Sequence, residues 1–307
     1  MNDTQTPTLV CIGFGYCARV LAARVAALGW SVAATARQDD KAQALRADGI
    51  DAHVWPPDTL LDALPPRTRL LISAPPGEAG DPVLVRYRES LLRQAAQIEW
   101  VGYLSTTAVY GDRQGGRVDE TGALTPASER GRRRAAAERE WLALADGLPR
   151  DGLPQDGLSQ DGLPIHTFRL AGIYGPGRGP FEKIRRGTVQ RIDKPGQVFG
   201  RIHVEDIATV LQASIARPDP GTAYNVTDDL TCPPQEVIGH AADLLGLPRP
   251  PLVPFGDAEM SPMARSFYGE NKRVANDRIK TRLGVTLAYP TYREGLAAIL
   301  AAEGSAS

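Results

Sequence analysis

The sequence predicts an α/β fold, in which helices cover both faces of a parallel sheet and a smaller, mainly helical lobe completes the chain. Three observations carry this prediction. Short apolar runs alternate with amphipathic stretches over the first 110 residues, a pattern typical of parallel sheets. The 307 residues, 42% of them hydrophobic, are enough to bury a large core. Glycines follow the first apolar run directly, which indicates a tight turn between a strand and a helix.

The first half of the chain is predicted to alternate strands with helices. Apolar runs bounded by glycine, proline or polar residues indicate buried strands, and apolar spacings of three and four indicate helices. Gly29 and Gly49 suit the C-terminal ends of the first two helices. The predicted strands are Thr8–Ile12, Ser31–Ala36, Leu70–Ala74 and Val101–Ser105, and the predicted helices are Arg19–Leu28, Lys41–Ala47, Val83–Ile98 and Ser128–Leu144.

Residues 146–165 consist of four copies of a five-residue unit that begins Asp-Gly-Leu. Glycine and proline at this density exclude a long helix or a central strand, so we expect a low-complexity loop insertion. Beyond it, the sequence predicts the strands His166–Leu170, Val198–Val204 and Ala223–Val226 and the helix Ile207–Ala216.

These elements predict two domains. The main domain is expected to span 1–170 and to be rejoined by 198–228. The smaller lobe is expected to consist of 171–197 and 229–307, where glycine and proline become frequent.

Composition narrows the classes of function. The net charge of −1 gives no reason to expect nucleic acid or an anionic membrane as a partner. No apolar run approaches the ~20 residues that span a bilayer, and the polar N-terminus lacks the pattern of a signal peptide. Cys11, Cys17 and Cys232 are the three cysteines. They favour a reducing, cytoplasmic compartment and form no metal-binding pattern, so we expect no metal.

The segment Gly13-Phe14-Gly15-Tyr16-Cys17-Ala18 has the G-x-G-x-x-A spacing of a dinucleotide-binding turn. The first glycine makes the turn, the second lets the backbone approach a pyrophosphate, and the small Ala18 lets helix and strand pack closely. The helix N-terminus then offers N–H groups to the phosphates. Between a predicted strand and a predicted helix, this spacing indicates a Rossmann-type domain that binds a dinucleotide.

The end of the second predicted strand indicates which dinucleotide binds. A carboxylate at this point would hold the ribose 2′-hydroxyl of NAD, but the strand ends in Ala36-Arg37. A guanidinium can hold a 2′-phosphate with two hydrogen bonds, so we expect NADP(H) rather than NAD(H). Asp39 and Asp40 follow closely and leave NAD open. Ala74 and Pro75, after the third predicted strand, are expected to contact the cofactor as well.

Three further stretches carry a family resemblance. They are Tyr103–Asp112 (YLSTTAVYGD), Phe168–Arg178 (FRLAGIYGPGR) and Arg201–Asp206 (RIHVED). Together they resemble the extended short-chain dehydrogenases/reductases, the NAD-dependent epimerase/dehydratase family, and within it the atypical YeeZ-like branch. The resemblance implies an NAD(P)-dependent oxidoreductase or epimerase-like enzyme with a small-molecule substrate, and a homodimer.

The resemblance also assigns roles to residues, and the sequence departs from three of them. Thr106, with Ser105 beside it, stands where the family has the hydroxyl that orients the substrate. Arg130 and Arg134 stand where it has the tyrosine and the lysine of its proton relay, and Gly172 replaces a substrate-side asparagine. Arginine stays protonated near neutral pH and has no acceptor lone pair, so Arg130 cannot replace tyrosine. Arg134 can still hydrogen-bond a ribose hydroxyl.

The lost tyrosine leaves two hypotheses open. In the first, the chain is an NADP(H)-dependent enzyme that uses Thr106 and another acid–base group. His203 is a candidate because histidine titrates near neutral pH, and Tyr110 and Tyr174 follow, although tyrosines in such positions are more often core residues. In the second, the chain is a catalytically silent NADP(H)-binding redox sensor or scaffold.

Overall fold

The computed structural model describes residues 6–57, 59–145 and 162–305. The predicted loop insertion at 146–165 therefore lies, up to residue 161, outside the described residues. The chain forms two compact units. Unit 1 comprises residues up to 105 together with 133–169 and 211–224, and unit 2 comprises 106–132, 170–210 and 225–307. The predicted main domain included residues 106–132, whereas in the structure these residues belong to unit 2.

The main sheet has seven strands in the order β11-β7-β5-β4-β1-β2-β3. The order reverses between β1 and β4, which run parallel with Thr8 opposite Thr68. Dinucleotides bind at such a reversal in Rossmann-type sheets. The parallel sheet with this strand order confirms the predicted fold class. The strands are β1 Thr8–Ile12, β2 Ser31–Ala36, β3 Asp51–Val54, β4 Thr68–Ile72, β5 Ile98–Thr106, β7 Ile165–Leu170 and β11 Ala223–Val226.

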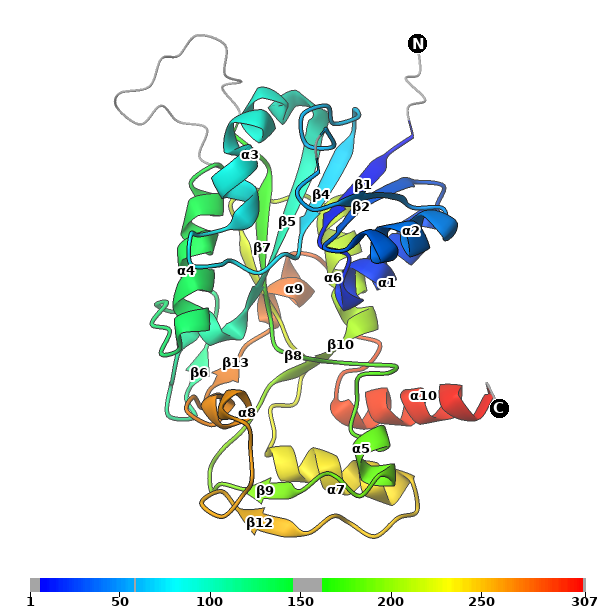
Figure 1. Cartoon of the computed structure of the whole chain (residues 1–307). Coiled ribbons are helices and arrows are strands. Elements are labelled where there is room, and N and C mark those ends of the chain that lie inside the picture. The colour runs from blue at the N-terminus through cyan, green and yellow to red at the C-terminus, as the bar shows by residue number, and fades with distance from the viewer. Residues whose placement is uncertain (1–5, 58, 146–161, 306–307) are drawn as a thin grey trace. The chain divides into compact units, whose positions relative to one another are not determined.

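Helices cover both faces of this sheet (Figure 1). On one face, α3 and α4 pack with β1, β4 and β5 in a core that includes Tyr87, Tyr103 and Trp141. On the other face, Trp100 Nε1 donates to Ser214 Oγ of α6 at 3.0 Å. The helices are α1 Tyr16–Ala26, α2 Asp39–Ala47, α3 Pro82–Arg93, α4 Glu129–Leu142 and α6 Val204–Ala216, with a 3-10 helix at Ala95–Gln97.

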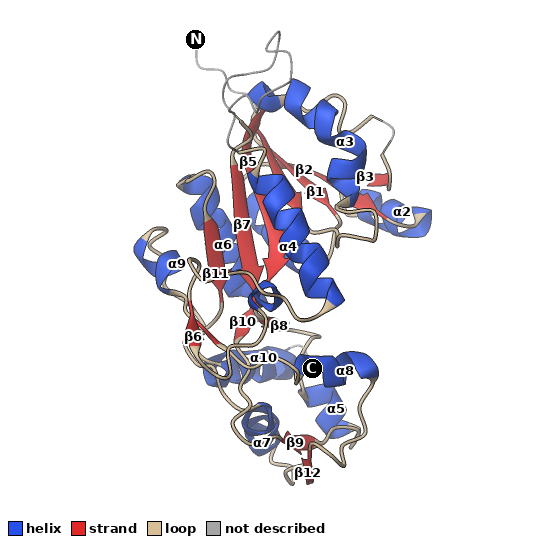
Figure 2. Cartoon of the chain, turned by 90° about the vertical axis from the view of Figure 1, so that its left-hand side faces the viewer, coloured by secondary structure: helices blue, strands red, loops and turns tan. Residues whose placement is uncertain are grey.

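Unit 2 combines helices with three two-stranded sheets (Figure 2). Its core joins β8, α5, α7 and α10 through residues such as Phe181, Val237 and Leu296. The strands are β6 Arg117–Val118, β8 Gly172–Tyr174, β9 Arg191–Asp193, β10 Arg201–His203, β12 Leu252–Pro254 and β13 Arg273–Val274. The helices are α5 Phe181–Arg185, α7 Pro234–Leu244, α8 Pro262–Phe267, α9 Asp277–Thr281 and α10 Tyr292–Ser305, with a 3-10 helix at Thr107–Tyr110.

Two predicted elements were wrong in extent. The predicted strand Val198–Val204 contains only β10, which pairs with β8 rather than with the main sheet. Its first residues bond elsewhere, since Val198 N donates to Asn271 Oδ1 and Phe199 pairs with Cys232. The predicted helix Val83–Ile98 ends at Arg93, because the residues after the 3-10 turn already belong to β5.

Among the described residues, no helix is long and apolar enough to cross a membrane. The same residues contain no group of three or more histidine, cysteine or acidic side chains placed to hold a metal ion. All three cysteines are buried and unbridged.

Candidate functional site

The turn between β1 and α1 requires glycine at its first motif position. Gly13 has a φ of 86°, which side chains of L residues rarely allow. A Cβ at Gly13 would lie 2.9 Å from Ser73 Oγ and 3.2 Å from the backbone nitrogen of Ala74. Gly13 N also donates to Thr35 Oγ1 at 2.9 Å. The turn is therefore fixed by β4 on one side and by β2 on the other.

The N-terminus of α1 has the features of a phosphate site. No heavy atom described here lies within 4 Å of the place where Gly15 would carry a Cβ. Among the described residues no side chain caps the helix, and its first turn contains no acidic residue. Ala18 is fully buried, as close helix–strand packing requires. A helix N-terminus without an acidic residue in its first turn suits a phosphate group, and the residues present fit a pyrophosphate.

The other residues expected to contact the cofactor surround this turn. Phe14 is half-buried, and the Arg19 guanidinium carbon lies 5.3 Å from the centre of its ring. Tyr16 is the first residue of α1. Ala74 and Pro75 follow β4, and Ala74 N donates to the carbonyl of Ile12 at 3.1 Å. All of these residues belong to unit 1.

Arg37 is exposed directly after β2. No carboxylate among the described residues lies within 4 Å of its guanidinium. Asp39 starts α2, accepts a hydrogen bond of 2.6 Å from Gln43 Nε2 and lies 3.9 Å from Arg46 Nη1. Of the two carboxylates that were alternative ribose ligands, Asp39 is therefore engaged along α2, whereas Asp40 is exposed on the same helix.

Ser105 faces a buried ion pair that the sequence did not predict. Its Oγ donates a hydrogen bond to Glu138 Oε1. Glu138 in turn pairs with Arg169 at 2.9 Å, and these two side chains are only 1% and 6% exposed. The hydroxyl is consequently directed toward the interior of unit 1. Nothing in the spacing of these residues shows that they meet, because the sheet brings them together.

Arg134, at the position of the family's lysine, is anchored to β5. Its Nη1 donates to the carbonyl of Leu104 at 2.7 Å and lies 3.3 Å from the hydroxyl of Tyr103. Burial raises the pKa of Tyr103 above its usual range, so that hydroxyl stays protonated. Nε and Nη2 of Arg134 have no hydrogen-bond partner among the described residues, and these groups can bind a ribose hydroxyl.

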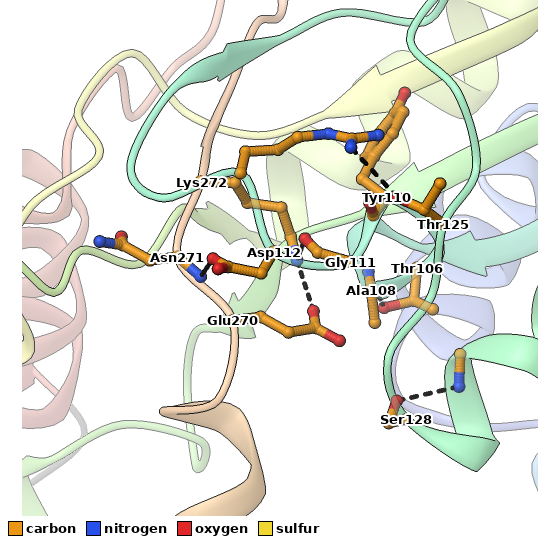
Figure 3. Close-up of polar contacts among 12 residues, drawn as sticks. Thr106, Ala108, Tyr110, Gly111, Asp112, Thr125, Ser128, Glu270, Asn271 and Lys272 are labelled. Atoms are coloured by element: carbon orange, nitrogen blue, oxygen red, sulfur yellow. Dashed lines mark hydrogen bonds and ion pairs between the residues drawn. The ribbon is translucent and has the colours of Figure 1, made fainter.

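Thr106, which Figure 3 labels, and Arg130 belong to unit 2. Thr106 Oγ1 accepts a hydrogen bond of 3.2 Å from Ala108 N and so caps the 3-10 helix. Arg130 is exposed in the first turn of α4, with its guanidinium carbon 5.7 Å from the centre of the Phe267 ring. Its contact is thus with an aromatic ring of α8, and no tyrosine hydroxyl stands at this point of the helix.

His203 lies inside an aromatic group. The ring is 2% exposed and lies 4.1 Å from the Tyr289 ring and 5.1 Å from the Tyr174 ring, centre to centre. Its Nδ1 accepts a hydrogen bond of 3.3 Å from Glu205 N, and its Nε2 has no partner among the described residues. Burial lowers the pKa of His203 to about 4. The neutral ring can accept a proton weakly but is not a proton donor at neutral pH.

The two tyrosine candidates are held inside unit 2. Tyr110 donates its hydroxyl proton to Asn225 Oδ1 at 2.7 Å, and Tyr174 donates to the carbonyl of Thr291 at 3.3 Å. Both side chains are buried. These contacts favour the core interpretation of the two tyrosines.

Figure 3 shows a second feature that the sequence did not predict, the segment Glu270–Lys272. Lys272 Nζ donates to the carbonyl of Gly111 at 2.8 Å and to Glu270 Oε2 at 2.5 Å. Asn271 N donates to Asp112 Oδ1 at 2.7 Å. Two hydrogen bonds thus hold Gly111 and Asp112, the end of the motif that begins at Tyr103, and the ion pair with Glu270 holds Lys272 in place.

Unit 2 also contains a cavity of about 330 Å³. That volume is near the lower end of the ~300–1,000 Å³ typical of small-molecule pockets. Segments far apart in the sequence line it, so no local pattern indicates it. Its polar lining includes Arg201, Lys183, Gln190, Tyr174, Tyr268 and Tyr292.

No protein-family profile matches the chain. Protein YeeZ of Escherichia coli K12 is 28% identical over 290 residues, which cover 91% of this chain and 95% of YeeZ. A solved structure of a functionally unknown conserved protein from Silicibacter pomeroyi DSS is 54% identical, and the match covers 97% of this chain and 99% of that one with a TM-score of 0.86. The chain belongs to the same family as that protein.

More distant structures show the fold. The human epimerase family protein SDR39U1, solved with NADPH, is 17% identical, with 95% of this chain and 98% of that chain covered and a TM-score of 0.66. A dTDP-glucose 4,6-dehydratase from Bacillus anthracis and the protein MoeE5, 14% and 21% identical with TM-scores of 0.70 and 0.71, are solved with NAD. The chain therefore has the fold of the extended short-chain dehydrogenases/reductases, and the resemblance that the motifs indicated is confirmed.

Proposed function

We propose that the chain is an NADP(H)-dependent oxidoreductase that works without the tyrosine–lysine relay of the epimerases. The observation that carries the proposal is the open turn at Gly13–Ala18 together with an Arg37 guanidinium that has no carboxylate partner among the described residues. The NADPH in the human neighbour and the NAD in other neighbours support a nicotinamide cofactor. The arginines at 130 and 134 argue against nucleotide-sugar epimerisation.

The proposal gives each residue a task. NADPH, when bound, supplies a hydride. The N-terminal amides of α1 bind its pyrophosphate, Arg37 binds the 2′-phosphate, and the unused nitrogens of Arg134 bind a ribose hydroxyl. The hydroxyl of Thr106 orients the oxygen of the substrate. Arg130 stabilises the negative charge that the hydride leaves on this oxygen but moves no proton, so the proton that completes the reduction comes from solvent.

The cofactor assignment is tested with Arg37→Ala. Thermal melts with equal concentrations of NADPH and NADH measure relative affinity, because ligand linkage scales with affinity. A hydrogen bond to a charged group contributes ~1.5–3 kcal/mol. We therefore expect the variant to lose about tenfold or more of the preference for NADPH. Lys41→Ala removes an exposed cation of α2 and should keep the preference. An undiminished preference in Arg37→Ala would show that another group binds the 2′-phosphate.

The second candidate function, an NADP(H) sensor without turnover, is favoured by one observation. The Ser105 hydroxyl is bonded to Glu138, in the interior of unit 1, which removes one polar group from the reaction. A screen of carbonyl compounds that follows NADPH oxidation separates the candidates. The enzyme hypothesis expects a substrate on which Thr106→Ala is at least about tenfold slower than wild type with NADPH affinity kept. Turnover that survives both Thr106→Ala and His203→Ala would overturn the assignment of both residues.

A further inference from the structure

The cavity of unit 2 presents a guanidinium that has no acidic partner. Arg201 lines the cavity, and its Nη1 donates to the carbonyl of Phe199 at 3.0 Å and to Cys232 Sγ at 3.2 Å. No carboxylate in the described part of the chain lies within 4 Å of this guanidinium, and its Nε and Nη2 groups make no hydrogen bond there. A partly buried cation in this state favours an anionic ligand.

The rest of the lining is aliphatic and aromatic, with one further cation. Tyr174, Tyr268 and Tyr292 line the cavity, and the Arg201 guanidinium carbon lies 6.0 Å from the centre of the Tyr292 ring. Lys183 adds a second cation, which is exposed and has no acidic partner among the described residues. Tyrosine rings beside a guanidinium suit a flat organic group that carries a negative charge.

Asp228 is the carboxyl group whose charge acts on Arg201. Its backbone N donates to the carbonyl of Arg201 at 2.6 Å. The side chain is 3% exposed; Oδ1 accepts one hydrogen bond of 3.3 Å from Leu230 N, and Oδ2 has no partner among the described residues. An ionised carboxylate is costly in this place because one oxygen is buried without a donor. Burial raises the pKa of Asp228 to about 7, against the attraction of Arg201.

The groups around Asp228 leave it as the one that titrates near neutral pH. Burial raises the pKa values of Tyr174 and Cys232 above their usual range, so both stay protonated. Asp229 is bonded to Lys280 Nζ at 2.5 Å and to Asn276 Nδ2 at 2.6 Å, which balances its charge. The net charge beside the cavity therefore depends on Asp228.

We propose that this cavity binds a small aromatic anion together with one proton, which Asp228 takes up while the anionic group of the ligand meets Arg201. When Asp228 is ionised, its charge opposes that of Arg201. When it is protonated, Arg201 is uncompensated and attracts an anion. The bound anion in turn favours protonation of Asp228, since a like charge nearby disfavours the carboxylate. The proposal goes beyond the proposed function, because none of the side chains given a task there lines this cavity.

The experiment uses benzenesulfonate, whose own charge does not change between about pH 5.5 and 8.5, and calorimetry on the full chain without NADPH. For wild type we expect constant affinity well below pH 7 and a loss that approaches about tenfold per pH unit above it. Titrations at about pH 8 in two buffers of different ionisation enthalpy should show uptake of close to one proton per ligand.

Three variants complete the test. Asp228→Asn should bind at all pH values as tightly as wild type binds at low pH, without proton uptake. Glu236→Gln removes an exposed carboxylate from α7, a helix that also lines the cavity, and should keep the pH dependence of wild type. Arg201→Met should abolish binding.

Two results would overturn the proposal. If wild type binds benzenesulfonate without proton uptake, Asp228 does not take up a proton on binding. This measurement tests the role of Asp228 even if Asp228→Asn does not fold. Absence of binding at any pH would remove the site. Neither result changes what the thermal melts with NADPH measure. A failure of this proposal is therefore distinguishable from a failure of the proposed function.

Discussion

Unit 1 and unit 2 form their candidate sites in different ways. In unit 1 the proposed phosphate site is a contiguous turn, Gly13–Ala18, and the charged side chains of Glu138 and Arg169, elsewhere in the unit, are buried as a pair. In unit 2 the cavity is lined from several separate segments, and Arg201 and Asp228 keep polar atoms without described partners. The comparison teaches that paired charges hold a scaffold, whereas unpaired ones are left for a ligand.

The largest effect should come from breaking the pair in unit 1. Glu138→Ala removes the carboxylate that pairs with the buried Arg169 and accepts the hydrogen bond of Ser105. We expect the free energy of unfolding, measured by urea titration, to fall by ~3–5 kcal/mol.

Glu140→Ala is the matched control for this variant. Glu140 lies on the same helix and faces Arg88 at 4.0 Å, with side chains 42% and 44% exposed. Exposed pairs contribute little, so the loss should stay under ~1 kcal/mol. Equal losses in the two variants would mean that burial of the Glu138 pair is not what distinguishes it.

The second-largest effect should come from a substitution that overpacks unit 2. A Cβ at Gly295 of α10 would lie 2.1 Å from the hydroxyl oxygen of Tyr174 and 2.7 Å from its Cε2. Tyr174 is buried and cannot swing away freely, so Gly295→Ala should lower the free energy of unfolding by ~1–3 kcal/mol. Gly304→Ala, on the same helix with no described atom within 4 Å, should leave it unchanged or raise it by up to ~1 kcal/mol. A neutral Gly295→Ala would show that α10 and Tyr174 can move apart.

The smallest expected effect tests the turn of unit 1. Gly13→Ala and Gly49→Ala each place alanine at a positive φ, 86° and 80°, which costs ~1–2 kcal/mol. The new Cβ at Gly13 meets β4, whereas Gly49 has no described atom within 4 Å. Both variants should melt earlier, but Gly13→Ala alone should bind NADPH more weakly, by about tenfold or ~1.4 kcal/mol. Similar NADPH titrations for the two variants would refute a cofactor role for the turn.

The sequence predicted buried strands better than element ends. Thr8–Ile12, Ser31–Ala36 and Ala223–Val226 have the predicted bounds, because apolar runs closed by polar residues or glycine leave little choice. The edge strand Asp51–Val54 was missed, since only Ala52 of its four residues is buried and it lacks an apolar run. The predicted helix from Val83 ran on to Ile98, because the sequence does not show that Ile98 already faces the sheet core.

What the sequence alone determined is local. The G-x-G-x-x-A turn, the Arg37 after β2 and the loss of the relay tyrosine at Arg130 follow from residues within a few positions of one another, because backbone conformation and helix starts depend on near neighbours. Only the tertiary structure decided that Ser105 bonds to Glu138, that Asp228 is buried and that Arg201 lines a cavity. Burial and pairing arise when segments distant in the chain pack together, and a pKa changes with them.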